Sequence, residues 1–236
     1  MILIKRKYII LVFISSLFLI VLLMNLNPKA NSLVVIVNKR IDNQINYNDV
    51  ISNLKDEYNN DAIVGILNVT NTGFNVPVVQ TSDNNYYLSH DLNNKDSNIG
   101  SIFLDYRVNI DTSKKLLIYG HSSSLVDAPF NILENYYDLD YYKNHKYMEL
   151  TTSSEKYVYE VFSVYTETNN FSYMDIDFID KKDFFNHIEE LQINSIYDSE
   201  IELKEEDQIL ILQTCSHHKD YVNYEKKYLL IILRRI

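Results

Sequence analysis

One stretch restricts the fold of this 236-residue chain more than any other, residues 209–215 with the sequence ILILQTC. Its aliphatic side chains follow the acidic residues 205–207 (EED) and precede the polar residues 216–220 (SHHKD). This pattern predicts a buried strand that opens into a polar loop. A second apolar run, residues 228–233 (YLLIIL), follows after one loop. The two runs are predicted to pair as antiparallel neighbours and to close the C-terminal part of a sheet.

The first of these runs ends on Cys215, the only cysteine of the chain. A lone thiol at the mouth of a strand suggests a nucleophile, and a nucleophile needs a base from elsewhere in the sequence. His121 is the best candidate, because it follows another apolar run that ends in glycine, residues 116–120 (LLIYG). A single cysteine is more often a small buried hydrophobic residue. The hypothesis therefore depends on both strands ending at one rim of the fold.

Composition excludes some classes of function. The hydrophobic fraction of 46% is enough for one domain with its own core and an additional segment. The net charge of -10 argues against nucleic acid as a partner and against docking on an anionic membrane face. With 20 tyrosines, 4 glycines and 3 prolines, the chain favours β-structure whose turns are made by asparagine and aspartate.

The N-terminus predicts a membrane anchor. Basic residues 5–7 (KRK) precede the uncharged residues 8–24, which are long enough to cross a bilayer as a helix with a cytoplasmic N-terminus. The predicted organisation is a basic stub and anchor over 1–30, an extracellular stalk and helix over 31–60, and the main domain over 61–236.

A cleaved signal peptide is the alternative to this anchor, although only residues 28–32 (PKANS) offer a cleavage site. In either case the main domain is expected outside the cell. One cysteine there cannot form an internal disulfide, so the thiol is buried, paired with another molecule, or used in chemistry.

The remaining periodicity predicts a mainly β domain with a few helices. Short apolar patches alternate with asparagine-rich and aspartate-rich turns up to residue 110, including residues 83–88 and 100–107, and short strands in this rhythm suggest a barrel or a sandwich. Asp180 is in capping position for a helix over 180–191. Further helices are predicted over residues 45–58 and 130–142. Strands are predicted over residues 61–69, 76–79, 116–120, 147–150, 156–166, 209–215 and 228–233.

Several motifs together resemble a known family. They are the N-terminal anchor, LLIYGH, the LQTC strand, the hydrophobic closing strand, VPVVQTSDNNYYLSHDL, GSIFLDYR and FNILENYYDLDYYKNHKYMELTT. In combination they resemble sortases, the membrane-anchored cysteine transpeptidases of Gram-positive bacteria, and class B sortases in particular. The similarity covers nearly all of the chain from residue 61 onward.

The resemblance implies an eight-stranded β-barrel with N-terminal helices and a helix in the connection before the cysteine strand. It implies cleavage of a sorting motif near the C-terminus of a secreted protein, a thioester on cysteine, and transfer to an amine of the peptidoglycan precursor. No cofactor is expected. Carried over by position, Cys215 is the nucleophile and His121 its acid/base partner. Asn84, Leu88 and Tyr119 fall where class B enzymes line the substrate groove.

The chain departs from the family at one position. Sortases carry an arginine near the start of the final strand, where this sequence has residues 225–229 (EKKYL). Lys227, or its neighbour Lys226, is predicted to substitute, with a positive charge but without the two-pronged hydrogen bonding of a guanidinium. At about 3.3 Å per strand residue, Arg234 would lie roughly 20 Å from Tyr228, at the opposite end of the barrel.

Other side chains compete for a chemical role. Cys215 with His217 and His218 could form a metal cluster, but three ligands so close at a strand end cannot easily face one ion. His90 is the only other histidine kept as a reserve base. Two groups are interpreted as solvated loops, the serines at 122–124 and the acidic residues at 175, 177 and 180.

Three functions follow from these residues. The first is a transpeptidase that anchors surface proteins to peptidoglycan, and the second is a thiol peptidase that releases the acyl group to water. The third is a catalytically silent, membrane-tethered binding module, which the missing arginine suggests. Pilus polymerisation is disfavoured, because no N-terminal lid segment is evident.

Overall fold

The computed structural model describes residues 45–236. The predicted anchor at residues 8–24 and the boundary at residue 30 lie outside the described residues. Within the described part, no helix combines the length and the apolar character that a membrane crossing requires. Residues Tyr47–Ile236 form one compact unit.

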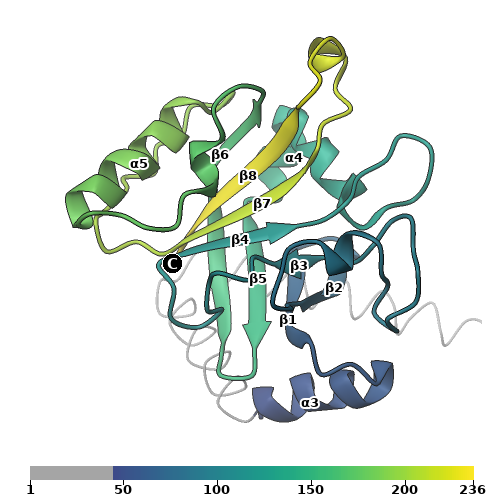
Figure 1. Ribbon diagram of the computed structural model, residues 1–236. Coiled ribbons are helices and arrows are strands. Elements are labelled where there is room, and N and C mark those ends of the chain that lie inside the picture. The colour runs from purple at the N-terminus through teal and green to yellow at the C-terminus, as the bar shows by residue number, and fades with distance from the viewer. Residues whose placement is uncertain (1–44) are drawn as a thin grey trace, which may run out of the picture. The chain divides into compact units, whose positions relative to one another are not determined.

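Eight strands close into a barrel in the order β1-β2-β3-β4-β7-β8-β6-β5 (Figure 1). Neighbours are antiparallel except for the pairs β2–β3 and β4–β7, which are parallel. This architecture confirms the predicted barrel and the predicted antiparallel pairing of the last two strands. The strands are β1 (Ile63–Val69), β2 (Asn75–Val79), β3 (Phe103–Leu104), β4 (Lys115–Tyr119), β5 (Tyr147–Thr152), β6 (Lys156–Glu167), β7 (Ile209–Cys215) and β8 (Tyr228–Arg235).

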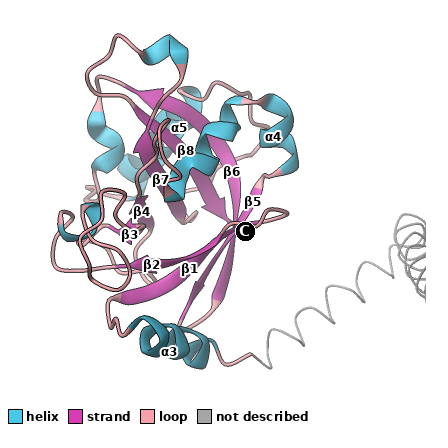
Figure 2. Ribbon diagram, turned by 90° about the vertical axis from the view of Figure 1, so that its right-hand side faces the viewer, coloured by secondary structure: helices cyan, strands magenta, loops and turns pink. Residues whose placement is uncertain are grey.

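The helices lie outside the barrel, with α3 at the end away from α4 and α5 (Figure 2). The α-helices are α3 (Tyr47–Tyr58), α4 (Leu139–Asn144) and α5 (Lys181–Ile193). The short 3-10 helices are η1 (Tyr86–Leu88), η2 (Pro129–Tyr137), η3 (Phe171–Met174) and η4 (Lys219–Tyr221). The helix predicted in the connection before the cysteine strand is therefore present as α5.

Two segments differ from the sequence prediction. The single helix expected over 130–142 is divided at Asp138, whose side chain accepts a hydrogen bond from the Tyr141 N–H at 2.8 Å and starts α4 anew. Residues 83–88 form a turn and a 3-10 helix. The cause is local, because Asp83 Oδ1 accepts the N–H groups of Asn85 and Tyr86 and so bends the chain.

Both faces of β7 are buried, which explains its continuous apolar sequence. Leu210 and Leu212 belong to the cluster that fills the barrel, whereas Ile209 and Ile211 belong to a second cluster outside it, with Phe184 of α5. Since strand side chains alternate, Cys215 continues the outer row. The strand therefore presents the thiol on the outside of the barrel wall, at its rim.

Candidate active site

His121 and Cys215 leave two neighbouring strands at the same rim. Strand β4 runs parallel to β7, and Tyr119 is in register with Gln213. The two residues that follow each of these positions therefore emerge side by side. This register agrees with the prediction that the histidine and the cysteine lie at one rim.

Hydrogen bonds hold the two strand exits together. The Gly120 N–H donates to Gln213 O at 3.2 Å, and Thr214 Oγ1 donates to Gly120 O at 2.8 Å. Ser122 Oγ donates to the carbonyl oxygen of Cys215 at 2.5 Å. This clasp, formed by residues 120–122 and 213–215, fixes the backbone on both sides of the candidate catalytic pair.

Gly120 is required at this exit because of its neighbour. A Cβ atom at this position would lie 2.7 Å from the ring of Phe130, which is fully buried. A larger residue would push the ring or the strand exit aside, and would displace the adjacent histidine with it.

A pocket of about 310 Å³ opens at this rim. It contains five of the six residues predicted for the site, and Lys227 is not among those that line it. The walls are mainly apolar and aromatic. The lining residues are Asn84, Leu88, Phe103, Tyr119, Gly120, His121, Tyr173, Met174, Gln213, Thr214, Cys215 and Tyr228.

The thiol of Cys215 is exposed at the pocket, but its surroundings favour the protonated form. Partial burial of the sulfur raises the pKa of Cys215, the charge of Lys227 lowers it, and the charge of Glu134 raises it. The net shift is upward. Because a thiolate is the reactive species, attack requires a group that removes the proton.

A backbone carbonyl holds the ring of His121, which lines the same pocket as Cys215. Its Nε2 lies 2.9 Å from Leu88 O. Since a carbonyl oxygen can only accept, Nε2 carries a hydrogen in this arrangement. The neutral imidazole then has its lone pair on Nδ1, which is the atom left to take a proton.

The start of β8 faces the cysteine. Tyr228 is in register with Cys215 and lines the pocket. Lys227 precedes it, is half-buried, and accepts the Ser216 N–H on its carbonyl oxygen at 2.9 Å. The ammonium group of Lys226 lies 5.6 Å above the ring of Phe171. Lys227 does not line the pocket, but its charge lowers the pKa of the Cys215 thiol.

Arg234 lies at the opposite end of the same ladder. It is in register with Ile209, six residues before the cysteine. Its guanidinium donates to Glu202 O at 3.0 Å and pairs with Glu160 at 3.4 Å. The position agrees with the expectation that this arginine cannot act at the thiol.

The other candidate side chains have different surroundings. His90 stacks on Tyr86 with ring centroids 3.9 Å apart and does not line the pocket. The His217 N–H donates to Glu134, and His218 starts η4 by accepting the Asp220 N–H. Residues 45–236 contain no group of three or more histidine, cysteine, aspartate or glutamate side chains arranged to hold a metal ion.

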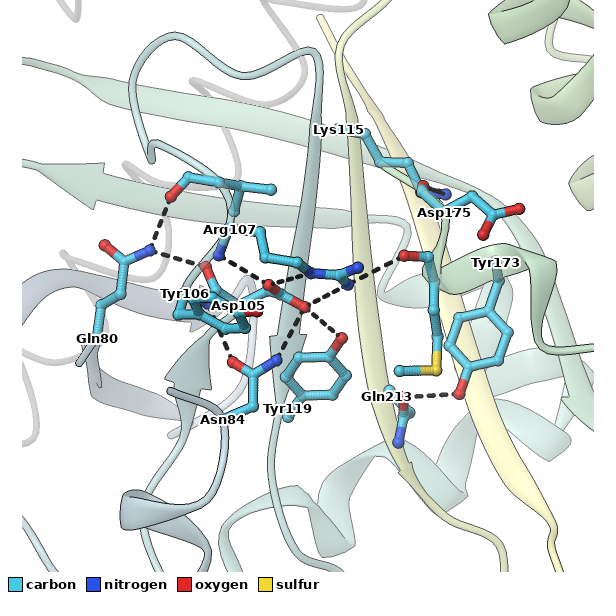
Figure 3. A network of polar contacts seen from close by, with 12 residues as sticks. Gln80, Asn84, Asp105, Tyr106, Arg107, Lys115, Tyr119, Tyr173, Asp175 and Gln213 are labelled. Atoms are coloured by element: carbon cyan, nitrogen blue, oxygen red, sulfur yellow. Dashed lines mark hydrogen bonds and ion pairs between the residues drawn. The ribbon is translucent and has the colours of Figure 1, made fainter. Parts of the chain in front are cut away.

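Sequence reasoning missed a polar cluster behind the pocket, centred on Asp105 and Arg107 (Figure 3). It also missed Tyr173, whose hydroxyl donates to Gln213 Oε1 at 2.7 Å. The available signal was the segment GSIFLDYR, which contains a carboxylate and a guanidinium two residues apart in an otherwise apolar context.

Comparisons with known proteins agree with this geometry. The family model described as Sortase domain matches residues 67–232. Sortase B of Listeria monocytogenes is 34% identical over 163 residues, which are 69% of this chain and 66% of that protein. Sortase B of Staphylococcus aureus is 31% identical over 157 residues, which are 66% of this chain and 64% of that protein. Each alignment spans slightly less than two thirds of the relative's own length.

Solved structures show the same fold. Sortase B of Clostridium perfringens superposes with a TM-score of 0.71 at 28% identity, covering 78% of this chain and 98% of that one. A Staphylococcus aureus sortase B–substrate complex gives a TM-score of 0.70 at 28% identity, covering 79% and 84%. A sortase B complexed with triglycine gives 0.73 at 27% identity, covering 82% and 88%. With a family model that matches most of the described barrel, these findings establish that the chain belongs to the sortase family.

Proposed function

We propose that this chain is a cysteine transpeptidase of the class B sortase type. It would cleave the sorting motif of a secreted protein and pass the acyl group to an amine of the peptidoglycan precursor. The single observation that supports this most is the register of β4 with β7, which brings His121 and Cys215 to one rim of a pocket. The solved complexes of related sortases with a substrate and with triglycine support a peptide donor and an amine acceptor.

The first half-reaction forms a thioester. Nδ1 of His121 takes the thiol proton of Cys215, and the thiolate attacks the carbonyl carbon of the scissile peptide bond. The tetrahedral intermediate collapses with cleavage of the C–N bond, and the imidazolium gives its proton to the leaving amine. One S–C bond has formed and one C–N bond has broken.

The second half-reaction reverses the roles of the groups. The acceptor amine attacks the thioester carbonyl, His121 removes a proton from the attacking nitrogen, and the thiolate of Cys215 leaves and is reprotonated. The products are a new amide bond and the free thiol. An amine in place of water as acceptor is what separates a transpeptidase from a thiol peptidase.

Lys227 supplies the positive charge in this proposal. Its ammonium lowers the pKa of Cys215 against the effect of burial and so favours the thiolate. The same charge stabilises a developing oxyanion, although without the bidentate geometry that a guanidinium would offer. The role is electrostatic support rather than a direct hydrogen bond.

The proposed setting is the outer face of the cytoplasmic membrane. Residues 8–24 would anchor the chain with its N-terminus in the cytoplasm, and the barrel would meet secreted substrates and cell-wall precursors outside.

Mass spectrometry of the full chain with a panel of sorting-motif peptides tests the proposal. We expect an acyl adduct on Cys215 and, when an amine acceptor is added, faster turnover with an amide product. Cys215→Ala should abolish the adduct, and His121→Gln should reduce its formation by at least about 100-fold. His90→Gln is the matched control, because this histidine lies outside the pocket.

Two outcomes would replace the proposal with its alternatives. Turnover that is indifferent to the amine and gives only the free acid would indicate a thiol peptidase. Absence of any adduct across the panel would indicate a silent binding module with a sortase fold.

A further inference from the structure

The carboxylate of Asp105 is the centre of the polar cluster behind the pocket (Figure 3). The residue is fully buried just after β3. Its two oxygens accept five hydrogen bonds, from Arg107 N at 2.9 Å, Arg107 Nε at 2.9 Å, Arg107 Nη2 at 2.8 Å, the Tyr119 hydroxyl at 2.8 Å and Asn84 Nδ2 at 3.1 Å. A carboxylate offers about four lone-pair sites, so this one has no capacity left for a ligand.

Electrostatics keep this carboxylate charged. Burial alone would raise the pKa of Asp105, but the hydrogen bonds from Arg107 and Tyr119 outweigh it and leave the pKa below its usual value. Both members of the ion pair are therefore charged at neutral pH. A pair of this kind is rigid, because breaking one partner would leave an uncompensated buried charge.

Arg107 extends the cluster to a separate segment. While its Nε and Nη2 bind the carboxylate, Nη2 also donates to Met174 O at 3.0 Å. Met174 is the last residue of η3, 67 positions further along the chain. The guanidinium thus connects η3 to the loop that follows β3.

The loop that carries the pair is fixed on its other side. Gln80 Nε2 donates to Asp105 O and to Val108 O, each at 2.8 Å. The side-chain amide of Asn84 is held by both of its polar atoms. Its Nδ2 donates to Asp105, and its Oδ1 accepts the Tyr106 N–H at 3.0 Å. Hydrogen bonds from two residues that follow β2, Gln80 and Asn84, therefore hold the loop that carries Asp105 and Arg107.

We propose that Asp105 and Arg107 are positioning residues that set the shape of the substrate pocket. Neither lines the pocket, but each of the three residues they hold does, and these come from three separate segments: Asn84, Tyr119 and Met174. The proposal rests on the transpeptidase function, since the pocket is taken to bind the donor peptide.

The catalytic pair is held by different contacts. The clasp of residues 120–122 and 213–215 and the bond from His121 to Leu88 O involve neither Asp105 nor Arg107. Loosening the cluster should therefore weaken peptide binding and leave the chemistry of the thiol largely unchanged. If the cluster served folding alone, variants that still fold would bind the peptide and react at the thiol as the unaltered chain does.

Steady-state kinetics of full-length variants test this separation. Arg107→Lys keeps the charge but cannot bind the carboxylate in two-pronged fashion and reach Met174 O as well. We expect KM for the peptide to rise by about tenfold with kcat within about twofold. Asp105→Asn should act in the same direction. Alkylation of Cys215 by iodoacetamide should proceed within about twofold of the unaltered rate, because it needs no peptide pocket.

Glu160→Gln is the matched control. It neutralises a second carboxylate that is paired with an arginine, because the partly buried Glu160 pairs with Arg234 at the far end of β8. This variant should leave KM unchanged. An unchanged KM in folded Arg107→Lys and Asp105→Asn would overturn the inference, as would a fall in kcat with no change in KM.

A second readout separates this inference from the proposed function. The chain has only 4 methionines, so the methyl resonance of Met174 can be followed by carbon-13 NMR. Arg107→Lys should shift the Met174 signal, whereas Glu160→Gln should not. If no peptide reacts with the unaltered chain, the transpeptidase proposal fails by itself, and an unshifted Met174 signal would then overturn the positioning role. If one of these variants does not fold, the same measurements are made on Tyr119→Phe, which removes one hydrogen bond to Asp105.

Discussion

Cys215 lies between opposite charges whose effects on its thiol can be measured separately. Lys227 lowers the pKa of Cys215, and Glu134 raises it. We therefore expect Lys227→Ala to raise the pKa further and Glu134→Gln to lower it. At a fixed pH near neutrality, the thiolate fraction and the rate of alkylation should fall in the first variant and rise in the second. The pH dependence of iodoacetamide labelling, followed by mass spectrometry, gives both values.

Tyr228→Phe is the control for these two variants. It changes the residue in register with Cys215 but removes no charge. Its pH midpoint for alkylation should match that of the unaltered chain. A midpoint that moves only in Tyr228→Phe would show that the phenol, and not Lys227, governs the thiol.

The residues that no local pattern predicts are those joined over long distances. Asp105 and Tyr119 are 14 positions apart, and Arg107 and Met174 are 67 apart. Hydrophobic periodicity reports only which face of a segment is buried, so it cannot pair a carboxylate with a distant hydroxyl or carbonyl. By contrast, Cys215 ends an apolar run and His121 follows one, and that pattern predicted that the two residues lie at one rim.

At the scale of one element, β4 carries a buried charge at the end away from the active site. Lys115 begins the strand, is 3% exposed, donates to Asp175 O at 2.7 Å and lies 2.6 Å from Nε2 of His187. Burial lowers the pKa of Lys115 to about 7. Burial and the charge of Lys115 lower the pKa of His187 to about 4.

This lysine should make stability depend on pH. Between about 7 and 10.5 the unfolded chain binds a proton at Lys115 that the folded chain does not. Lys115 should therefore contribute a rise in the free energy of unfolding as the pH increases through this window, by an amount on the order of a few kcal/mol. In Lys115→Met the rise should be absent, and the variant should be more stable than the unaltered chain at pH 7. Urea denaturation at pH 7 and pH 9 measures the difference.

Thr112→Ala provides a comparison for Lys115→Met, because it alters a nearby exposed loop without changing a titratable group. Its pH dependence should follow that of the unaltered chain. Equal slopes for Lys115→Met and the unaltered chain between pH 7 and pH 9 would contradict the lowered pKa.

Helix α5 gives a second prediction at this scale. Its capping residue, Asp180, accepts the Asp183 N–H at 2.8 Å, as the sequence predicted for this position. Asp180→Ala should lower the free energy of unfolding by about 1 kcal/mol, because one N–H at the start of the helix loses its partner. Asp180→Ser should restore most of the loss. Equal stability of the alanine variant and the unaltered chain in urea denaturation would refute the cap.

Elements with one strong pattern were predicted well, and those with mixed signals were not. Residues 209–215 form a strand with the predicted bounds because both of its faces are buried and the flanking segments are polar. For the same reason, the sequence could not say which side of the barrel wall would present the thiol. The turn at residues 83–88 depends on one carboxylate that accepts two backbone N–H groups, which outweighs the β propensity of its tyrosines.

For the whole molecule, the described structure extends the compact unit beyond the predicted domain boundary at residue 61. Helix α3 contributes Ile51, which is 3% exposed, to the cluster on the outer face of the barrel, and Leu54 and Tyr58 pack against that cluster. Asn60 donates to the Tyr87 hydroxyl at 2.8 Å. The barrel thus depends on residues 47–60 for part of its outer cover.

A truncation series tests this dependence. A fragment of residues 61–236 should have a free energy of unfolding at least about 3 kcal/mol lower than one of residues 45–236, because it exposes the apolar surface that α3 covers. In the longer fragment, Ile51→Ala should cost about 2–4 kcal/mol through the cavity it leaves. Ile45→Ala, at a residue 41% exposed, should cost little. Equal stability of the two fragments in urea denaturation would mean that the barrel closes without α3, and the boundary at 61 would then mark the folding unit.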